Sequence, residues 1–274
     1  MKIKTYVITG AASGIGKALL LKLAENNIIF AGFRNKSQEN DLKQISPNIY
    51  PFYVDYNIPE TIKEAGEYIL SKCTKIDTLI NIAGCVVAGP VEDLNIDEIR
   101  RQFNVNVFGH LDLTQRLIPL LECGKIINVS SMASFGIFPF ISPYCASKRC
   151  LDMFFNSLLV ENKKNIKVVS IKPGVIATPL WDKSIDENSK YFDNYGDYSQ
   201  EMKYVIANAQ KNGKSGLPAQ KVVDVILKAD RSKNPKLSYT VGKDAFFISL
   251  LSKLPQGIIN KIVKLGIKLR INKK

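Results

Sequence analysis

The chain has few of the residues that build metal centres and disulfide frameworks. His110 is its single histidine, and its cysteines are odd in number and form no CxxC pair: Cys73, Cys85, Cys123, Cys145 and Cys150. Cysteines without paired spacing are typical of reduced thiols in a cytoplasmic protein. A zinc site needs a cluster of His, Cys or carboxylate ligands, so we expect no metal.

Long apolar runs are also missing. The longest, Ile28–Phe33 and Ala245–Leu251, fall well below the roughly 20 residues that cross a bilayer. The opening MKIKTYVITG leads directly into a strand-like run and has no small-residue cleavage site of a signal peptide. Repeats and linkers are absent, so 1–274 is predicted to form a single domain of a cytoplasmic protein.

Acidic residues are absent from Ala245 to Lys274, although the chain carries a net charge of +13. Apolar residues there are spaced to share one helical face: Ile258, Ile259, Ile262, Val263, Gly266 and Leu269, with Lys261, Lys264 and Lys268 elsewhere. This predicts a basic helical tail over 243–274. Such a helix could lie on an anionic membrane surface, cap the substrate pocket or dock on a partner subunit. We expect no nucleic acid partner, because only charge and no recognised motif points to one.

The rest of the chain alternates short apolar runs with helix-length segments. Strands are expected at Thr5–Thr9, Ile28–Arg34, Tyr50–Asp55, Thr78–Ala83, Lys125–Ser130, Lys167–Lys172 and Ser238–Val241. Helices are expected at Gly14–Asn26, Pro59–Lys72, Gln102–Glu122 and Pro143–Lys163. Continuous apolar strands suit a sheet covered on both faces. The pattern predicts an α/β fold: a Rossmann-type, doubly wound parallel sheet of about seven strands, with helices on both faces and the helical tail at its end.

Ligands bind such sheets at the carboxyl ends of the strands. After the first strand comes TGAASGIG, in which Gly10 permits a tight turn, Gly14 a close approach to a pyrophosphate and Gly16 close helix packing. Ser13 and Ile15 complete this loop, and the following helix offers free N–H groups to phosphates. The loop predicts a dinucleotide site.

The second strand ends at Arg34, where an NAD-specific fold would place an acid for the ribose 2′-hydroxyl. A guanidinium can instead pair with a 2′-phosphate. This favours NADP(H) and leaves NAD possible, since Arg34 could also be a solvated surface charge and Ser13 adds no second cation.

Tyr144 and Lys148 are four residues apart and would share one face of a helix. A tyrosine ordinarily titrates near 10, and a nearby ammonium would lower its pKa enough for acid–base work. Ser131, at the end of the fifth predicted strand, could donate a hydrogen bond to a substrate oxygen. Its neighbour Ser130 is the alternative. Asn106 is a polar residue in an apolar helix and needs a reason to be there.

In order and spacing, these motifs resemble the short-chain dehydrogenase/reductase family from about Lys4 to Thr178. The resemblance implies that Asp55 contacts the adenine, that Asn81 ties strands together beside the cofactor, and that Ala83 and Gly84 pass close to its ribose. It implies that Lys148 holds the nicotinamide ribose and that Asn106 relays protons through water to Lys148. The PGxxxT motif would hold the nicotinamide carboxamide through Pro173, Gly174, Ile176 and Thr178.

The resemblance thus implies hydride transfer between NAD(P)(H) and a carbonyl or alcohol, with Tyr144 as the proton donor. An aromatic-rich segment, 179–217, is the expected lid over a lipophilic substrate: Trp181, Tyr191, Phe192, Tyr195, Tyr198, Met202 and Tyr204. The run Phe138–Lys148 resembles members that act on retinoids and steroids. Family members commonly form dimers or tetramers, so a homo-oligomer is expected. The alternative function is a cofactor-binding, non-catalytic scaffold or a membrane-associated interaction protein.

Overall fold

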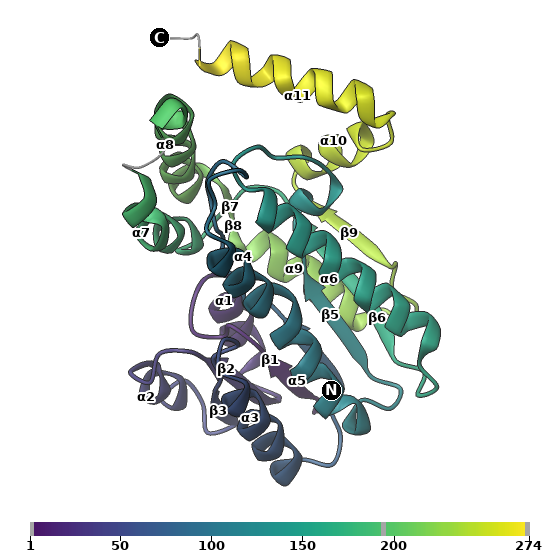
Figure 1. Ribbon diagram of the computed structural model, residues 1–274. Helices are drawn as coiled ribbons and strands as arrows, with labels where there is room; N and C mark the ends of the chain where they lie inside the picture. Colours follow the sequence, from purple (N-terminus) through teal and green to yellow (C-terminus); the bar gives the residue numbers. More distant parts are fainter. Residues whose placement is uncertain (1–2, 193–195, 272–274) are drawn as a thin grey trace.

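The computed structural model describes residues 3–192 and 196–271, without the side chains of 190–192 and 270–271 (Figure 1). Seven parallel strands form the central sheet in the order β3-β2-β1-β4-β5-β6-β9. Their bounds are β1 Thr5–Ile8, β2 Ile28–Phe33, β3 Ile49–Tyr53, β4 Thr78–Asn81, β5 Lys125–Val129, β6 Lys167–Pro173 and β9 Ser238–Val241. The order reverses at β1, so the crevice of this doubly wound sheet lies between the carboxyl ends of β1 and β4.

Helices cover both faces of the sheet, as the alternating pattern predicts. One face packs against α1 (Gly14–Leu23), α2 (Gln38–Lys43) and α9 (Ala219–Arg231). The other packs against α3 (Pro59–Lys72), α5 (Gly109–Leu117) and α6 (Ser142–Glu161). The strands are buried on both sides because each face has its own apolar core, which explains their unbroken apolar sequences.

The helix expected over Gln102–Glu122 has a different form. It starts earlier, with α4 (Ile96–Phe103), because Asn95 caps it by accepting a hydrogen bond from the Asp97 N–H. It then widens into a π-helical turn, η1 (Asn104–Phe108), before α5. The 3₁₀ turn η2 (Ile118–Leu120) ends it. π-Helical turns inside α-helices are frequent at functional sites.

The remaining elements lie at the carboxyl ends of the strands. They are the 3₁₀ turns η3 (Met132–Phe135) and η4 (Gly196–Tyr198), the two-stranded sheet of β7 (Ile176–Ala177) and β8 (Leu217–Pro218), and the helices α7 (Leu180–Phe192) and α8 (Ser199–Ser215). The tail forms two helices, α10 (Lys243–Leu251) and α11 (Gln256–Ile271). Among the described helices, none is long and apolar enough to cross a membrane.

Candidate active site

A single cavity of about 710 Å³ brings most of the predicted site residues together. It opens beside the carboxyl ends of the strands, and α7 and α8 form part of its wall. Its lining includes the expected residues Gly10, Ser13, Gly14, Ile15, Arg34, Asp55, Ala83, Gly84, Ser131, Tyr144, Lys148, Pro173, Gly174, Ile176 and Thr178. Gly16, Asn81 and Asn106 lie behind this lining.

The glycine loop has the backbone of a phosphate cradle. Gly10 and Gly14 have φ angles of +65° and +54°, a region that side chains disfavour. A Cβ on Gly16 would collide with the Gly10 carbonyl, so Gly16 serves packing and not contact with a ligand. The first turn of α1 carries no acidic side chain, and its free N–H groups and positive dipole face the cavity. These residues fit a dinucleotide pyrophosphate.

Two polar residues behind the lining stabilise the carboxyl end of β4 and the loop after it. The Thr9 hydroxyl accepts hydrogen bonds from the Ile82 and Ala83 N–H groups, at 2.9 and 3.3 Å. Asn81 donates to Asn128 of β5 at 2.8 Å, so it ties two strands together and does not reach the cavity. Sequence reasoning assigned Thr9 no role. The sequence feature that points to Thr9 is a polar residue at the end of an apolar strand.

His110 supports the same loop from the opposite side. Burial lowers its pKa to about 3, so the ring is neutral, and its Nε2 lies 2.8 Å from the Ala83 carbonyl. A neutral ring must carry its proton on Nε2 to donate there. The histidine ring packs against Tyr56, and it also fixes the position of Ala83.

Lys148, Tyr144 and Ser131 meet where α6, β5 and η3 adjoin. The Lys148 ammonium donates to the Val129 carbonyl at 3.0 Å and lies 5.8 Å from the centroid of the Tyr144 ring. The Ser131 hydroxyl accepts a hydrogen bond from the Ala133 N–H at 3.1 Å and lies close enough to the Tyr144 phenol to lower its pKa. Ser130, the alternative, instead donates to the Lys148 carbonyl at 3.4 Å. Successive residues of an extended segment point to opposite sides, which explains why only Ser131 faces the phenol.

Burial sets the charge states of this group. It raises the pKa of Tyr144 to about 12, against the lowering effect of Ser131. It lowers the pKa of Lys148 to about 8, against the raising effect of Asp152. The sequence predicts that Lys148 lowers the pKa of Tyr144, whereas in the protein without cofactor burial raises it. The phenol is held protonated, which is the form a proton donor needs.

Asn106 sits in the π-helical turn, with its side chain committed to hydrogen bonds inside the protein. Its Oδ1 accepts from the Cys85 N–H at 2.9 Å, and its Nδ2 donates to the Cys85 carbonyl and the Ser147 hydroxyl, at 3.0 Å each. A proton relay would have to use its backbone and not its amide. The side chain positions the loop next to Lys148.

Two further amides that the sequence reasoning missed continue this arrangement. Gln102 of α4 accepts from the Val87 N–H. Asn188 of α7 accepts from the Ala88 N–H at 3.1 Å and donates to the Val86 carbonyl at 2.9 Å. Side-chain amides from three helical elements thus bind the backbone of 85–88 as a neighbouring strand would. The sequence feature that points to these residues is an amide side chain among the apolar positions of a helix, because a buried amide needs hydrogen-bond partners.

Arg34 lies at the cavity rim and pairs with α7. Its Nη2 is 3.4 Å from Glu187 Oε1, while Arg101 Nη1 is 3.1 Å from Glu187 Oε2. The guanidinium is about half exposed, at 51%. It therefore lies where a ligand in the cavity could contact it.

Asp244, the first acid after β9, holds the loop that follows β6. Its carboxylate accepts from the Val175 N–H at 2.7 Å and lies so close to Gly174 that any side chain there would overlap it. A Cβ on Gly14 would stand 3.4 Å from the Thr178 side chain, so the glycine loop and the loop after β6 are in close contact. The sequence assigns Asp244 no role, because it is next to Lys243 and only balances that charge.

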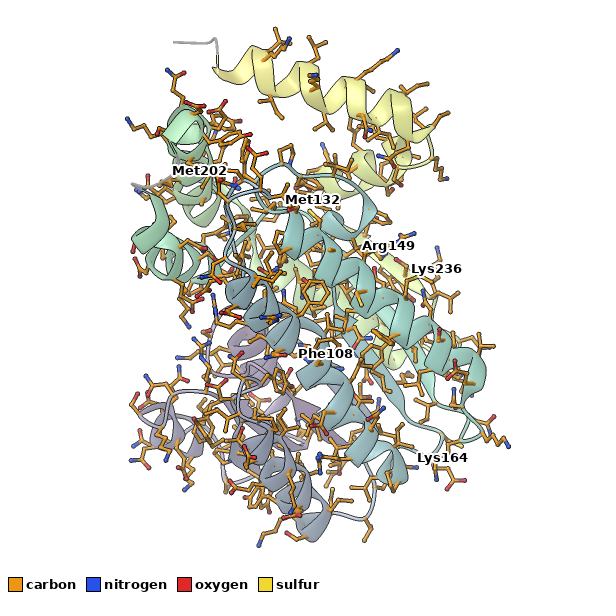
Figure 2. The ribbon with its side chains drawn as sticks, in the orientation of Figure 1. Phe108, Met132, Arg149, Lys164, Met202 and Lys236 are labelled. Atoms are coloured by element: carbon orange, nitrogen blue, oxygen red, sulfur yellow. The ribbon has the colours of Figure 1, made fainter. Side chains whose placement is uncertain are left out.

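Of the lid aromatics, Trp181 and Tyr204 line the cavity. Met202 of α8 (Figure 2) is buried against Ala88, together with Phe140 and Tyr198. Tyr195, Lys273 and Lys274, and the side chains of Tyr191, Phe192 and Arg270, lie outside the described part of the chain.

A phosphate cradle and a Ser–Tyr–Lys group that line one cavity define a site for nicotinamide-dependent oxidation and reduction. A family model described as short chain dehydrogenase matches residues 4–189. The NADPH-dependent 3-dehydrocapnine reductase of Ornithobacterium rhinotracheale is 31% identical, over 93% of this chain and 94% of its own. The 3-ketodihydrosphingosine reductase of Bacteroides thetaiotaomicron is 29% identical, over 97% and 98%. A short-chain dehydrogenase structure from Burkholderia cenocepacia, in complex with NADP, has a TM-score of 0.75 at 22% identity, over 96% and 98%.

The chain belongs to the short-chain dehydrogenase/reductase family. It is an oxidoreductase that acts on CH–OH or C=O groups and binds a nicotinamide nucleotide.

Proposed function

We propose that the protein is an NADPH-dependent reductase of a lipophilic ketone or aldehyde. The observation that carries this proposal is the meeting of Tyr144, Ser131 and Lys148 on the same cavity as the glycine loop. The two relatives described above support it, since both are named as reductases and one as NADPH-dependent.

The preference for NADP(H) rests on Arg34. The second strand ends without an acid that would bind a ribose 2′-hydroxyl, and the half-exposed guanidinium borders the cavity. A 2′-phosphate would compete with Glu187 for this guanidinium through charge-assisted hydrogen bonds. In the bound complex, Ser13, Gly14 and Ile15 would hold the pyrophosphate, Asp55 the adenine, and the loop from Pro173 to Thr178 the nicotinamide carboxamide.

The cofactor, when bound, supplies the hydride that reaches the carbonyl carbon. Tyr144 donates its proton to the carbonyl oxygen, which completes the alcohol. Ser131 donates a hydrogen bond to the same oxygen as negative charge develops on it. Lys148 binds the nicotinamide ribose, and its ammonium favours the phenolate left on Tyr144. Asn106 and the amides of Gln102 and Asn188 keep the loop beside them in place.

The substrate side of the cavity is apolar. Phe138, Phe140 and Ile141 line it from the segment before α6, and Trp181, Ile185 and Val205 line it from α7 and α8. Large apolar surface with few polar groups suits a lipophilic substrate. We propose that 179–217 acts as the lid over it, within a single domain.

A homo-oligomer and a cytoplasmic location remain predictions. The first is supported by exposed apolar side chains on two elements in contact, Phe108 (labelled in Figure 2) on η1 and Met153 and Phe154 on α6. Light scattering coupled to size exclusion would measure the number of subunits.

The first experiment titrates NADPH and NADH into the wild type and Tyr144→Phe, followed by nicotinamide fluorescence. Both proteins are then assayed on a panel of aldehydes, ketones and secondary alcohols. We expect both proteins to bind NADPH and Tyr144→Phe to lose about 10²- to 10⁴-fold in kcat/KM, because only the proton donor is removed. Binding of NADPH without turnover of any panel member by the wild type would support the non-catalytic scaffold instead.

Arg34→Gln provides the cofactor arm of the same experiment. Loss of a charge-assisted contact worth about 1.5–3 kcal/mol should weaken NADPH binding about 10- to 100-fold and leave NADH binding nearly unchanged. Equal weakening of both cofactors would exclude a contact with the 2′-phosphate.

A further inference from the structure

The last two helices and the turn between them expose eight large apolar side chains. We call this set the tail face: Phe246, Phe247, Leu250, Leu254, Ile258, Ile262, Leu265 and Leu269, each between 39% and 61% exposed. Single exposed apolar residues are ordinary, whereas a contiguous group usually marks an interaction surface. Figure 1 shows α11 extending from α10 toward the end of α8, outside the main body of the domain.

On α11 the apolar residues divide into two faces. Ile258, Ile262, Leu265 and Leu269 follow one another at intervals of four, three and four residues, which places them in one outward stripe. Ile259, Val263, Gly266 and Ile267 are half-buried instead, and Ile267 lines the active-site cavity. The single stripe expected from the sequence is thus split into an exposed set and a half-buried set, and Ile267 of the half-buried set reaches the cavity.

The charged residues that follow Asp244 in the chain are all basic. Lys253, Lys261, Lys264 and Lys268 are exposed, and no acidic residue occurs from Ala245 onward. At 3.6 residues per turn, Lys261 and Lys268 border the stripe along its length, and Lys264 lies farther round on the same side. A second copy docking face to face would bring like charges together. An anionic surface with an apolar layer beneath it complements both features.

We propose that α10 and α11 dock on the surface of an anionic lipid bilayer. The tail face enters the boundary between headgroups and acyl chains, and the bordering lysines contact the phosphates. This docking goes beyond the proposed reductase function and does not require it. If that function holds, Ile267 places the cavity rim next to the lipid, which would give a lipophilic substrate a short route into the site.

The test is co-sedimentation of the full-length protein with vesicles of phosphatidylcholine, with and without phosphatidylserine, at low and high salt. We expect binding to the anionic vesicles, weaker binding to the neutral ones, and a loss of binding as salt rises. An interfacial lysine contributes about 1 kcal/mol, so each one removed should weaken binding about fivefold.

Two sets of variants separate the apolar from the charged contribution. The double variant Ile262→Glu with Leu265→Glu should reduce binding at least tenfold, and Leu70→Glu, on the exposed side of α3, is its matched control. The triple variant with Lys261, Lys264 and Lys268 each changed to Gln should lose salt-dependent binding. Its control changes the exposed Lys22, Lys72 and Lys75 to Gln. Circular dichroism checks that each variant is folded.

The proposal is overturned if the wild type stays in the supernatant with both kinds of vesicle, or if the control variants lose as much binding as the tail variants. It is also overturned if light scattering shows a dimer that Ile262→Glu with Leu265→Glu dissociates while vesicle binding is unchanged. Assays on small water-soluble ketones without vesicles keep the two proposals apart. Tail variants should retain that activity, and a wild type that lacks it contradicts the reductase function and not the docking.

Discussion

At the scale of single residues, burial shifts the pKa values of Lys148 and Tyr144 in opposite directions, because it disfavours the charged form of each. Lysine is charged when protonated, so its pKa falls to about 8, whereas tyrosine is charged when deprotonated, so its pKa rises to about 12. Between these values Lys148 is neutral and Tyr144 still carries its proton. Lys148 therefore limits the active form at alkaline pH.

This predicts a pH profile for kcat/KM with NADPH as the varied substrate, which reports on the protein before the cofactor binds. The value should be level below pH 8 and fall as pH rises through about 8, because Lys148 loses the ammonium that binds the ribose. Lys148→Met should be poorly active at every pH and lack this fall. A wild-type profile that stays level to pH 10 would contradict the assignment.

At the scale of elements, side chains from other segments hold the cofactor loops in place. Asn106, Gln102 and Asn188 bind the backbone of 85–88, and Asp244 binds the turn at Val175. α10 therefore starts with a residue that supports the nicotinamide end of the site. Asp244 thus connects the helical tail to the active site.

Asp244→Ala should weaken cofactor binding about tenfold, with a smaller effect on kcat, because it leaves the Val175 N–H without its acceptor and frees the loop that carries Thr178. Fluorescence titration with NADPH measures the change. Lys243→Ala, its exposed neighbour, serves as the control and should bind as the wild type does. If Asp244→Ala binds NADPH with wild-type affinity, the loop does not depend on this carboxylate.

At the scale of the whole molecule, a network near the amino ends of the central strands β1 and β4 stabilises the fold. Asp230 of α9 accepts from Lys4 at 2.8 Å, from Tyr6 of β1 at 2.9 Å and from Thr78 of β4 at 2.6 Å. Burial alone would raise the pKa of this carboxyl. The hydrogen bonds from Lys4 and Thr78 outweigh burial, and the pKa is lowered from the ordinary value of 3.8.

Asp230→Ala should lower the free energy of unfolding by about 3 kcal/mol, since it leaves buried partners unsatisfied. Urea unfolding at pH 7 measures this. A lowered folded-state pKa stabilises the protein above the unfolded value, so the difference between wild type and variant should shrink as pH falls below about 4. Cofactor affinity should stay unchanged, because the network lies away from the cavity. An unchanged unfolding midpoint at pH 7 would count against the network.

Much of this protein could be predicted from local sequence. The glycine spacing defines a strand–turn–helix cradle, the four-residue interval puts Tyr144 and Lys148 on one helical face, and unbroken apolar strands indicate a sheet covered on both sides. These features depend on residues close together in the chain, where backbone geometry alone relates spacing to position. The amphipathic character of α11 belongs to the same group.

Only the tertiary structure decided what meets across the fold. Asn188 reaches Ala88 over 100 positions of sequence, Glu187 pairs with Arg34, and Asp244 reaches Val175, and no periodicity encodes such contacts. Burial in the assembled cavity likewise raised the pKa of Tyr144 where its neighbour in the sequence suggested a lowering. The packing of α11 left one apolar stripe uncovered. Local patterns determine each element, whereas contacts, burial and charge states follow from how a parallel sheet brings distant strand ends to one edge.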